Sequence, residues 1–212
     1  MLLWNSVVEI LRESIFAYAQ ACQGNLGWGI VIVTCLARLA LAPLGIRLAI
    51  AAKRHQTAMA RIQPALDALR AKYKGDAQRL AVETRQLLQR EGISLAPAGL
   101  LGNLAQIPVM LALYSAIRQV ANVGGRFFWI RSLAMPDPLL TVVVVGVTAA
   151  STFVAPVTSS SNQGFTVVFS VIMTAVVLSK MAAGIGLYWG LSSLFGVLQS
   201  VWVQRTMRGS AA

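Results

Sequence analysis

The stretch that decides the fold is Gly27–Ile46, GWGIVIVTCLARLALAPLGI, an apolar run with a single arginine, Arg38, near its middle. A helix that crosses a membrane needs about 20 predominantly apolar residues, and this run is long enough. A charged side chain at the bilayer centre costs from about 3 to 10 kcal/mol or more, depending on the reference state. Arg38 lies about 12 residues, or roughly 18 Å of helix, into the run, which is too deep for easy snorkelling outward. We therefore expect the other membrane helices to give this cation a wet, polar recess.

The composition of the whole chain is that of an integral membrane protein. Of its 212 residues, 57% are hydrophobic and only 12% are charged, and the mean hydropathy is +0.67. Soluble domains carry about 25% charged residues. The formal net charge of +11 is expected to reflect which loops face the cytoplasm and contact with anionic lipid or RNA-rich partners. The lack of aromatic-interleaved basic motifs argues against direct DNA binding. Cys22 and Cys35 have no zinc or redox spacing, so we expect no metal and no cofactor.

Five apolar segments predict an all-α fold with five transmembrane helices. These spans cover about residues 26–46, 98–117, 139–157, 165–179 and 185–203. Residues 1–24 are too charged to span, and their apolar residues at helical spacing predict an amphipathic helix lying in the membrane interface on the outside. Pro43 is expected to kink or end the first span.

Residues 47–93, between the first two spans, have a different character. They hold ten basic and four acidic residues, a net charge of +6. The positive-inside rule places this segment in the cytoplasm, which puts the N-terminus outside and the short tail 207–212 inside. Apolar residues keep a helical period on either side of Lys74-Gly75-Asp76. The segment is therefore predicted to form two antiparallel helices packed as a hairpin.

Several motifs, in this order, resemble the YidC/Oxa-type membrane protein insertase family over about residues 25–206, the expected insertase core. They are Trp28-Gly29 ahead of RLALAPLGIR (Arg38–Arg47), RIQPALDALRAKYKGDAQRL (Arg61–Leu80), QIPVMLALYSAI (Gln106–Ile117), FWIRSLAMPDPLL (Phe128–Leu140) and GLYWGLSSLFGVLQSVWVQR (Gly186–Arg205). The resemblance implies a five-helix core. It also implies a hydrophilic groove that is open to cytoplasm and lipid and closed toward the outside. The N-terminal residues do not resemble an organelle presequence, so a bacterial plasma (inner) membrane is the expected location. The chain departs from the pattern at Asn103, where the family usually has proline, and at Met181–Ala183, which lacks the usual proline.

The resemblance also implies site residues. Arg38 matches the groove arginine, and Gln106 matches the polar residue of the second span. Because the attraction of a substrate to Arg38 must stay transient, other polar residues of the spans are expected to share the groove. Its candidate residues are Arg38, Gln106, Asn103, Thr34, Thr148, Ser151, Thr152, Thr174 and Ser192. The substrate-receiving hairpin is expected to use Lys53, Arg54, Arg61, Lys72 and Lys74. Helix–helix packing explains hydroxyl residues in a membrane equally well, and an interhelical hydrogen bond would explain Gln106 and Asn103.

The function that this reading favours is a membrane protein insertase and chaperone. Newly made membrane proteins and the bilayer are its expected partners, with the ribosome and a Sec-type translocon as further candidates. An enzyme is not expected, because no predicted span holds Asp or Glu and the only histidine lies outside the spans. The alternative is a small transporter or channel that uses Arg38 to attract anions. Transporters often have repeated halves, and no repeat is evident in this sequence.

Overall fold

The structure is a computed structural model that describes residues 2–94, 98–154 and 163–209. Within these ranges it contains seven helices and no β-strand longer than an isolated bridge. The helices are α1 Leu2–Ala21, α2 Leu26–Lys72, α3 Ala77–Arg90, α4 Ala98–Ala121, α5 Pro138–Val154, α6 Gln163–Leu178 and α7 Ala183–Gly209. The chain divides into two compact units: a bundle unit, residues 1–44 with 106–212, and a hairpin unit, residues 45–105. The expectation of an all-helical fold is confirmed for the described part of the chain.

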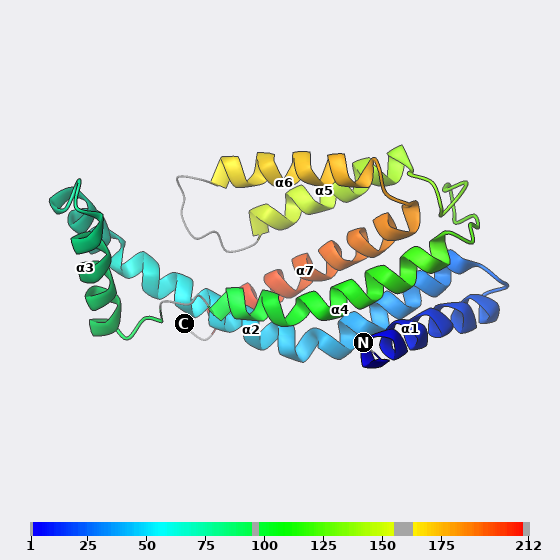
Figure 1. The fold of residues 1–212 in the computed structure, drawn as a ribbon, viewed down its shortest axis with the longest axis horizontal. Helices are drawn as coiled ribbons and strands as arrows, with labels where there is room; N and C mark the ends of the chain where they lie inside the picture. The colour runs from blue at the N-terminus through cyan, green and yellow to red at the C-terminus, as the bar shows by residue number, and fades with distance from the viewer. Residues whose placement is uncertain (1, 95–97, 155–162, 210–212) are drawn as a thin grey trace. The chain divides into compact units, whose positions relative to one another are not determined.

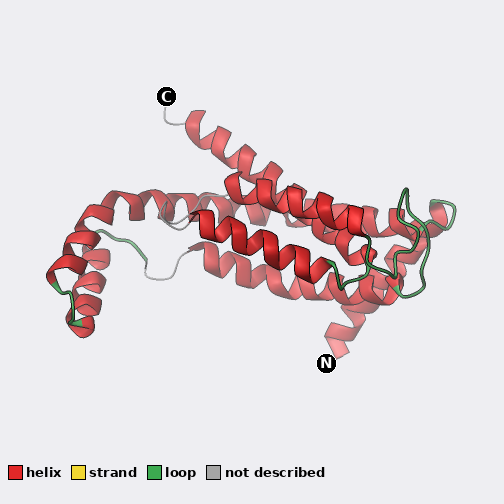
Figure 2. Ribbon diagram, turned by 90° about the horizontal axis from the view of Figure 1, so that it is seen from above, coloured by secondary structure: helices red, strands yellow, loops and turns green. Residues whose placement is uncertain are grey.

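Consecutive helices of the bundle unit run in alternating, antiparallel directions (Figures 1 and 2). Three connections lie together at one end, which we call the loop end: 22–25, 122–137 and 179–182. Backbone hydrogen bonds fasten the longest connection to the start of α7. The Gly184 amide donates to the Leu133 carbonyl at 3.0 Å, and the Ala183 amide donates to the Met135 carbonyl at 3.0 Å. Asp137 then begins α5 by accepting a hydrogen bond from the Leu140 amide at 2.7 Å, as an N-cap does.

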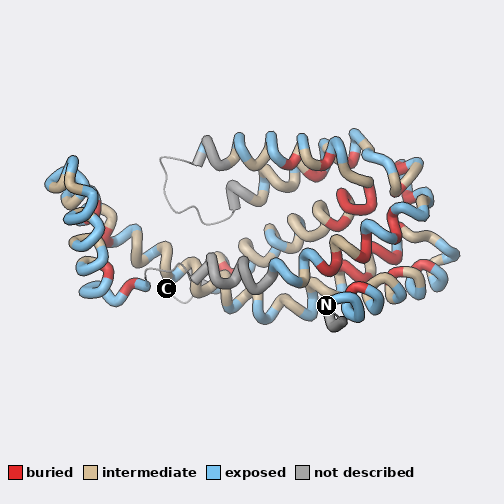
Figure 3. Tube along the Cα trace, in the orientation of Figure 1, coloured by how far each residue is buried: buried red, intermediate tan, exposed pale blue. Residues whose placement is uncertain are grey.

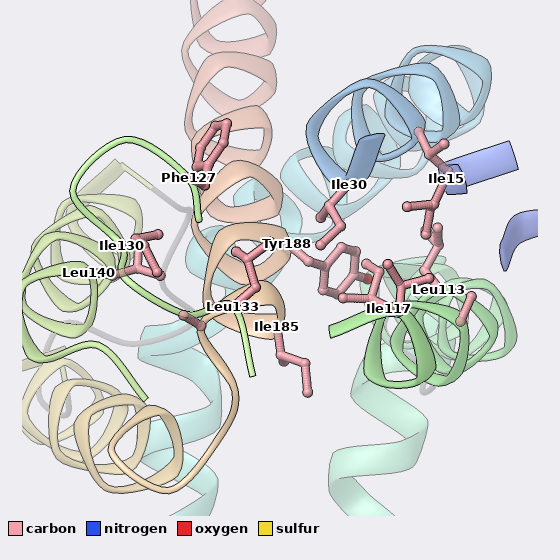
Figure 4. Close-up of a cluster of buried hydrophobic side chains, with 14 of the residues drawn as sticks. Ile15, Ile30, Leu113, Ile117, Phe127, Ile130, Leu133, Leu140, Ile185 and Tyr188 are labelled. Atoms are coloured by element: carbon pink, nitrogen blue, oxygen red, sulfur yellow. The ribbon is translucent and has the colours of Figure 1, made fainter. Parts of the chain in front are cut away.

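Buried apolar side chains gather toward the loop end of the bundle unit (Figure 3). Ile30 of α2, Ile117 of α4 and Leu133 of the long connection are almost wholly buried and belong to one cluster (Figure 4). Further along the same helices, apolar side chains are exposed. Examples are Leu39 of α2 and Leu198 of α7, each about three-fifths exposed. Among the described residues of the bundle unit, buried apolar side chains are therefore concentrated toward the loop end.

Helix α1 packs against the start of α2 through a glycine. A Cβ atom at Gly29 would lie 2.3 Å from the carbonyl oxygen of Ile15 and 3.2 Å from the Ala19 Cβ. Only a residue without a side chain allows such a close approach of two helices. Ile15 and Ala19 are consequently buried, while the Glu9–Arg12 ion pair is exposed. The helix expected within residues 1–24 is thus present, and its location in the membrane interface stays a prediction.

The hairpin unit consists of the second part of α2, α3 and the residues that follow. Ile62 and Leu66 of α2 pack against Leu88 and Ile93 in a small buried cluster. The predicted break is present: α2 ends at Lys72, Gly75 adopts a φ of +107° that glycine favours, and the Asp76 carboxylate caps α3 by accepting from the Arg79 amide at 2.9 Å.

The first span differs from expectation at its end. Pro43 is expected to kink or end the helix of residues 26–46, but α2 continues without interruption to Lys72. The expectation that the helix ends there is wrong. Proline removes one backbone hydrogen bond and crowds the preceding turn, but the bonds on both sides of it remain. The first span and the first helix of the hairpin are therefore one helix of 47 residues.

Length and composition identify one described helix, α2, as able to cross a membrane. Three shorter apolar segments, Ile107–Ala121, Pro138–Ser151 and Val167–Leu178, lie in α4, α5 and α6. The ends of the other expected spans lie within a few residues of the helix ends, except that α7 extends to Gly209. The number of membrane crossings and the side on which each terminus lies stay predictions.

Replacing Leu88 with alanine should loosen the hairpin unit. Leu88 is buried in the small cluster of this unit, and truncating a buried leucine costs about 2–4 kcal/mol. Hydrogen exchange of α3 amides should accelerate strongly, because few other apolar contacts hold this helix. Val82→Ala is the matched control, since Val82 lies on the same helix and is more than half exposed. Equal acceleration in both variants would contradict this account of the hairpin.

Candidate functional site

The site is built around Arg38, which α2 places in the bundle unit with its side chain half-buried. The Arg38 Nε donates a hydrogen bond to the Ser192 Oγ of α7 at 3.2 Å. Both residues lie past the buried core, roughly 18 Å and 14 Å along their helices from the loop end. The structure therefore brings together two predicted groove residues that are 154 positions apart in sequence.

Tyr188 is a third member of the site that the sequence analysis missed. It lies one turn before Ser192 on α7, and its hydroxyl lies beside both Ser192 and Arg38. Its ring is buried at the edge of the core, near Ile117 of α4 (Figure 4). The i, i+4 spacing of Tyr188 and Ser192 is the sequence signal that could have identified it, because residues four apart share a helix face.

The charge of Arg38 has no carboxylate partner among the described residues. All seven acidic residues of the chain lie in the described ranges. Four of them pair with nearby arginines: Glu9 with Arg12, Asp67 with Arg70, Asp76 with Arg79 and Glu91 with Arg61. A buried or half-buried arginine usually pairs with an acid or hydrogen-bonds fully. Among the described residues, the groups placed beside the Arg38 guanidinium are the hydroxyls of Ser192 and Tyr188, and no carboxylate neutralises its charge.

Thr34 lies one turn before Arg38 on the same helix face. Its side chain is fully buried, and its Oγ1 has no hydrogen-bond partner within the described ranges. An unpartnered buried hydroxyl costs about 1–3 kcal/mol. Thr34 therefore adds a polar atom between the apolar core and Arg38 without being bonded to either.

The remaining predicted groove residues are less closely tied to Arg38. Thr148 of α5 has a buried Oγ1 that lacks a partner in the described structure, and Ser151 donates to the Thr148 carbonyl at 2.7 Å. Thr174 of α6 is buried. None of these three hydroxyls is hydrogen-bonded to Arg38 within the described ranges. The side chains of Asn103, Gln106 and Thr152 lie outside the described residues, so their roles stay predictions.

The predicted substrate-receiving cations lie on the hairpin unit in several environments. Arg54 and Lys74 are exposed, Lys53 donates to Gln56 at 3.3 Å, Arg61 pairs with Glu91 at 2.9 Å, and the Lys72 ammonium lies 5.2 Å from the Tyr73 ring centre. A shallow pocket of about 300 Å³ lies between α2 and α3. Leu69 and Leu87 line its apolar part, and Lys72, Glu83 and Arg90 supply charge. This surface combines apolar contact with positive charge, and its use by substrates stays a prediction.

Comparison with known proteins gives matches along almost the whole chain. Residues 17–210 match the model of a family described as 60Kd inner membrane protein. Membrane protein insertase YidC 1 of Halalkalibacterium halodurans is 31% identical over 210 residues, covering 95% of this chain and 79% of that protein. Membrane protein insertase YidC of Fusobacterium nucleatum is 30% identical, covering 86% and 87% of the two chains. The Legionella pneumophila (strain Corby) protein is 28% identical, and the match spans 96% of this chain but 36% of that one.

A solved structure supports the same fold. The crystal structure of an active YidC insertase with its first transmembrane domain resolved superposes with a TM-score of 0.64 at 21% sequence identity. The superposition covers 92% of this chain and 45% of the solved one. With the family model matching most of the sequence, the resemblance predicted from the motifs is confirmed. The chain belongs to the 60Kd inner membrane protein family, whose matching members are named YidC membrane protein insertases.

Proposed function

We propose that this protein is a membrane protein insertase that moves single-span and small membrane proteins from the cytoplasm into the bilayer through a polar groove containing Arg38. One observation carries the proposal. A half-buried arginine on a long apolar helix is held by a serine hydroxyl and has no carboxylate partner among the described residues. A cation in such a place is costly, so a function is the default explanation.

The Arg38 side chain is suited to binding a carboxylate transiently. A guanidinium group has five N–H donors, and Ser192 accepts only the one on Nε. The outer edge of the group, with its two Nη nitrogens, matches the two oxygens of an acidic side chain. At an effective dielectric constant of about 20, two charges 4 Å apart attract by about 4 kcal/mol, and by about 1 kcal/mol in water. Attraction in this range draws an acidic translocating tail into the groove and still releases it.

The apolar segment of the substrate then leaves toward lipid. Past the core, α2, α4 and α7 expose apolar side chains such as Leu39, Met110 and Leu194. Such side chains allow an apolar segment to slide along the helices without meeting a polar barrier. Each Å² of apolar surface that moves from water into the membrane gains about 25 cal/mol, which provides the driving force. No covalent bond is made or broken in this process.

The hairpin unit supplies the first contact in the proposed pathway. Its exposed cations attract acidic or amphipathic segments and anionic headgroups, and its shallow apolar pocket accepts a bulky side chain. These features fit a cytoplasmic location for the hairpin in a plasma (inner) membrane protein. The ribosome and a Sec-type translocon are further proposed partners on this side.

Reconstituted insertion tests the role of Arg38. Vesicles containing the protein are given a small single-span protein with an acidic translocated tail. Arg38→Ala should slow its insertion by about tenfold, since a charge-assisted hydrogen bond is worth about 1.5–3 kcal/mol. Arg38→Lys should give an intermediate rate, because a point charge remains without the bidentate geometry. Arg118→Ala is the matched control, as it removes an exposed arginine from the end of α4.

Two outcomes would reject the proposal. Insertion that is equally fast in the parent and in Arg38→Ala would remove the arginine from the mechanism. Rapid anion flux through vesicles without any substrate protein, lost in the same variant, would favour the transporter or channel instead.

A further inference from the structure

The tight turn Arg126–Arg131, RFFWIR, lies in the long connection at the loop end and is not used by the proposed insertion mechanism. Two backbone hydrogen bonds close it. The Phe127 amide donates to the Ile130 carbonyl at 3.0 Å, and the Ile130 amide donates to the Phe127 carbonyl at 2.8 Å. This leaves Phe128 and Trp129 as the two residues at the tip.

The base of the turn is anchored and its tip is exposed. Phe127 and Ile130 are buried in the main core (Figure 4), whereas Phe128 is 70% exposed and Trp129 is 51% exposed. Phe127 lies directly over Gly27 of α2, where a Cβ atom would be 2.1 Å from its ring. The turn is therefore a rigid projection of the core, and its two exposed aromatic rings are presented in a fixed place.

The aromatic rings at the tip continue onto α2. The Trp28 ring centre lies 5.6 Å from that of Phe127 and 5.9 Å from that of Phe128, both in edge-to-face geometry. The Phe127 and Phe128 ring centres are 4.7 Å apart. Trp28 is itself partly exposed. Together, Trp28, Phe128 and Trp129 form an aromatic surface at the loop end.

The backbone at Phe128 has a φ of +48°, a conformation that glycine and asparagine adopt far more readily than phenylalanine. A structural turn would favour glycine at this position. The phenylalanine therefore imposes a conformational cost of about 1 kcal/mol, and strain of this kind concentrates where a side chain has a task.

Two arginines flank the turn. Arg126 precedes the bridged residue Phe127, Arg131 follows the bridged residue Ile130, and both are exposed. Each arginine is bonded in sequence to one residue of the bridged pair, so the two arginine backbones lie close together at the base of the turn. Neither forms an ion pair with a carboxylate within the described ranges. The turn thus combines an aromatic tip with two free guanidinium groups.

We propose that this turn binds the headgroup of an anionic phospholipid in the membrane leaflet at the loop end. The guanidinium group of arginine can donate two parallel hydrogen bonds to the oxygens of a phosphate group. Tryptophan and other aromatic rings prefer to lie at the depth of the lipid headgroups. The exposed rings lie among the glycerol and upper acyl regions, and Arg126 and Arg131 clasp the phosphate. The lipid thereby fixes the depth of the loop end relative to the bilayer surface.

Lipid titration of the detergent-solubilised protein, followed by native mass spectrometry, tests this site. Phosphatidylglycerol should bind the parent more tightly than phosphatidylcholine. The double variant R126Q/R131Q should weaken the first phosphatidylglycerol bound by about tenfold or more, because each arginine near a headgroup contributes to the attraction. The matched control R118Q/K180Q removes the same charge from two exposed positions outside the turn and should keep the parent affinity.

A second variant separates lipid binding from folding. Phe128→Asn removes the ring but suits a positive φ, so the relief of strain about offsets the lost ring contacts and the melting temperature should change little. Quenching of Trp129 fluorescence by lipids brominated near the headgroup should fall in Phe128→Asn. The Trp129 signal is obtained by subtracting the spectrum of Trp129→Phe.

Each contrary result overturns the proposal. Equal weakening in R126Q/R131Q and R118Q/K180Q would mean that net charge alone attracts the lipid. Equal binding of the two lipids by the parent would mean that the turn has no headgroup site. Unquenched Trp129 in lipid vesicles would place the tip against a protein partner or in water.

Discussion

Replacing Gly29 with alanine should lower the melting temperature of the detergent-solubilised protein by roughly 4–10 °C, equivalent to about 2–3 kcal/mol in a chain of this size. The new Cβ would lie 2.3 Å from the backbone carbonyl oxygen of Ile15, where real contacts of this kind do not occur. A backbone atom cannot rotate away as a side chain does. Helix α1 would therefore have to move off α2, which would loosen the buried contacts of Ile15 and Ala19.

Gly196→Ala provides the control for this experiment. Gly196 lies inside α7, and a Cβ atom there would meet nothing within 4 Å. Because alanine favours helix over glycine by about 1 kcal/mol, this variant should melt at the parent temperature or slightly above it. If both glycine variants melted alike, the close contact between α1 and α2 would not contribute to stability.

The largest effect on function is expected from reversing the charge of Arg38. In the insertion assay, Arg38→Glu should slow a substrate with an acidic tail by about a hundredfold or more, because attraction is replaced by repulsion of similar size. A substrate with the same span and a basic tail should be inserted better by Arg38→Glu than by the parent. Misfolding would not explain this pair of results, because the variant would insert the acidic-tail substrate more slowly than the parent and the basic-tail substrate faster.

Arg118→Glu is the matched control for the reversal. It introduces the same charge change at an exposed position on α4. It should leave the ratio of acidic-tail to basic-tail insertion within about twofold of the parent, as expected for an exposed charge. If Arg38→Glu slowed both substrates equally, the arginine would act by stabilising the bundle and not by reading the charge of the tail.

The sequence predicted the helices well because long apolar runs and turn residues are local signals. The break at Gly75, the hairpin on either side of it and the start of α5 at Pro138 all follow from such signals. The continuation of α2 through Pro43 does not follow from local signals. A proline removes one hydrogen bond from a helix, and the helix continues when the hydrogen bonds on both sides of the proline outweigh that cost.

The site was predicted in part. Arg38 could be identified alone, because a charge in an apolar run has no ordinary explanation. Ser192 was one of many hydroxyl residues, and only the packing of α7 against the rest of the bundle brings it to Arg38. Tyr188 was overlooked because aromatic residues are common in apolar helices. The close approach at Gly29 also depends on which helices meet, which residue spacing along one chain does not determine.

The concentration of buried side chains at the loop end makes the bundle unit mechanically uneven. Helices held by buried contacts at one end could part at the other by bending, because the described residues there form fewer buried contacts. In the proposed insertion function, a groove between such helices would have no fixed width, so substrates of different size would enter at similar cost. Selection between substrates would then depend on the charge of their leading segments and not on their size.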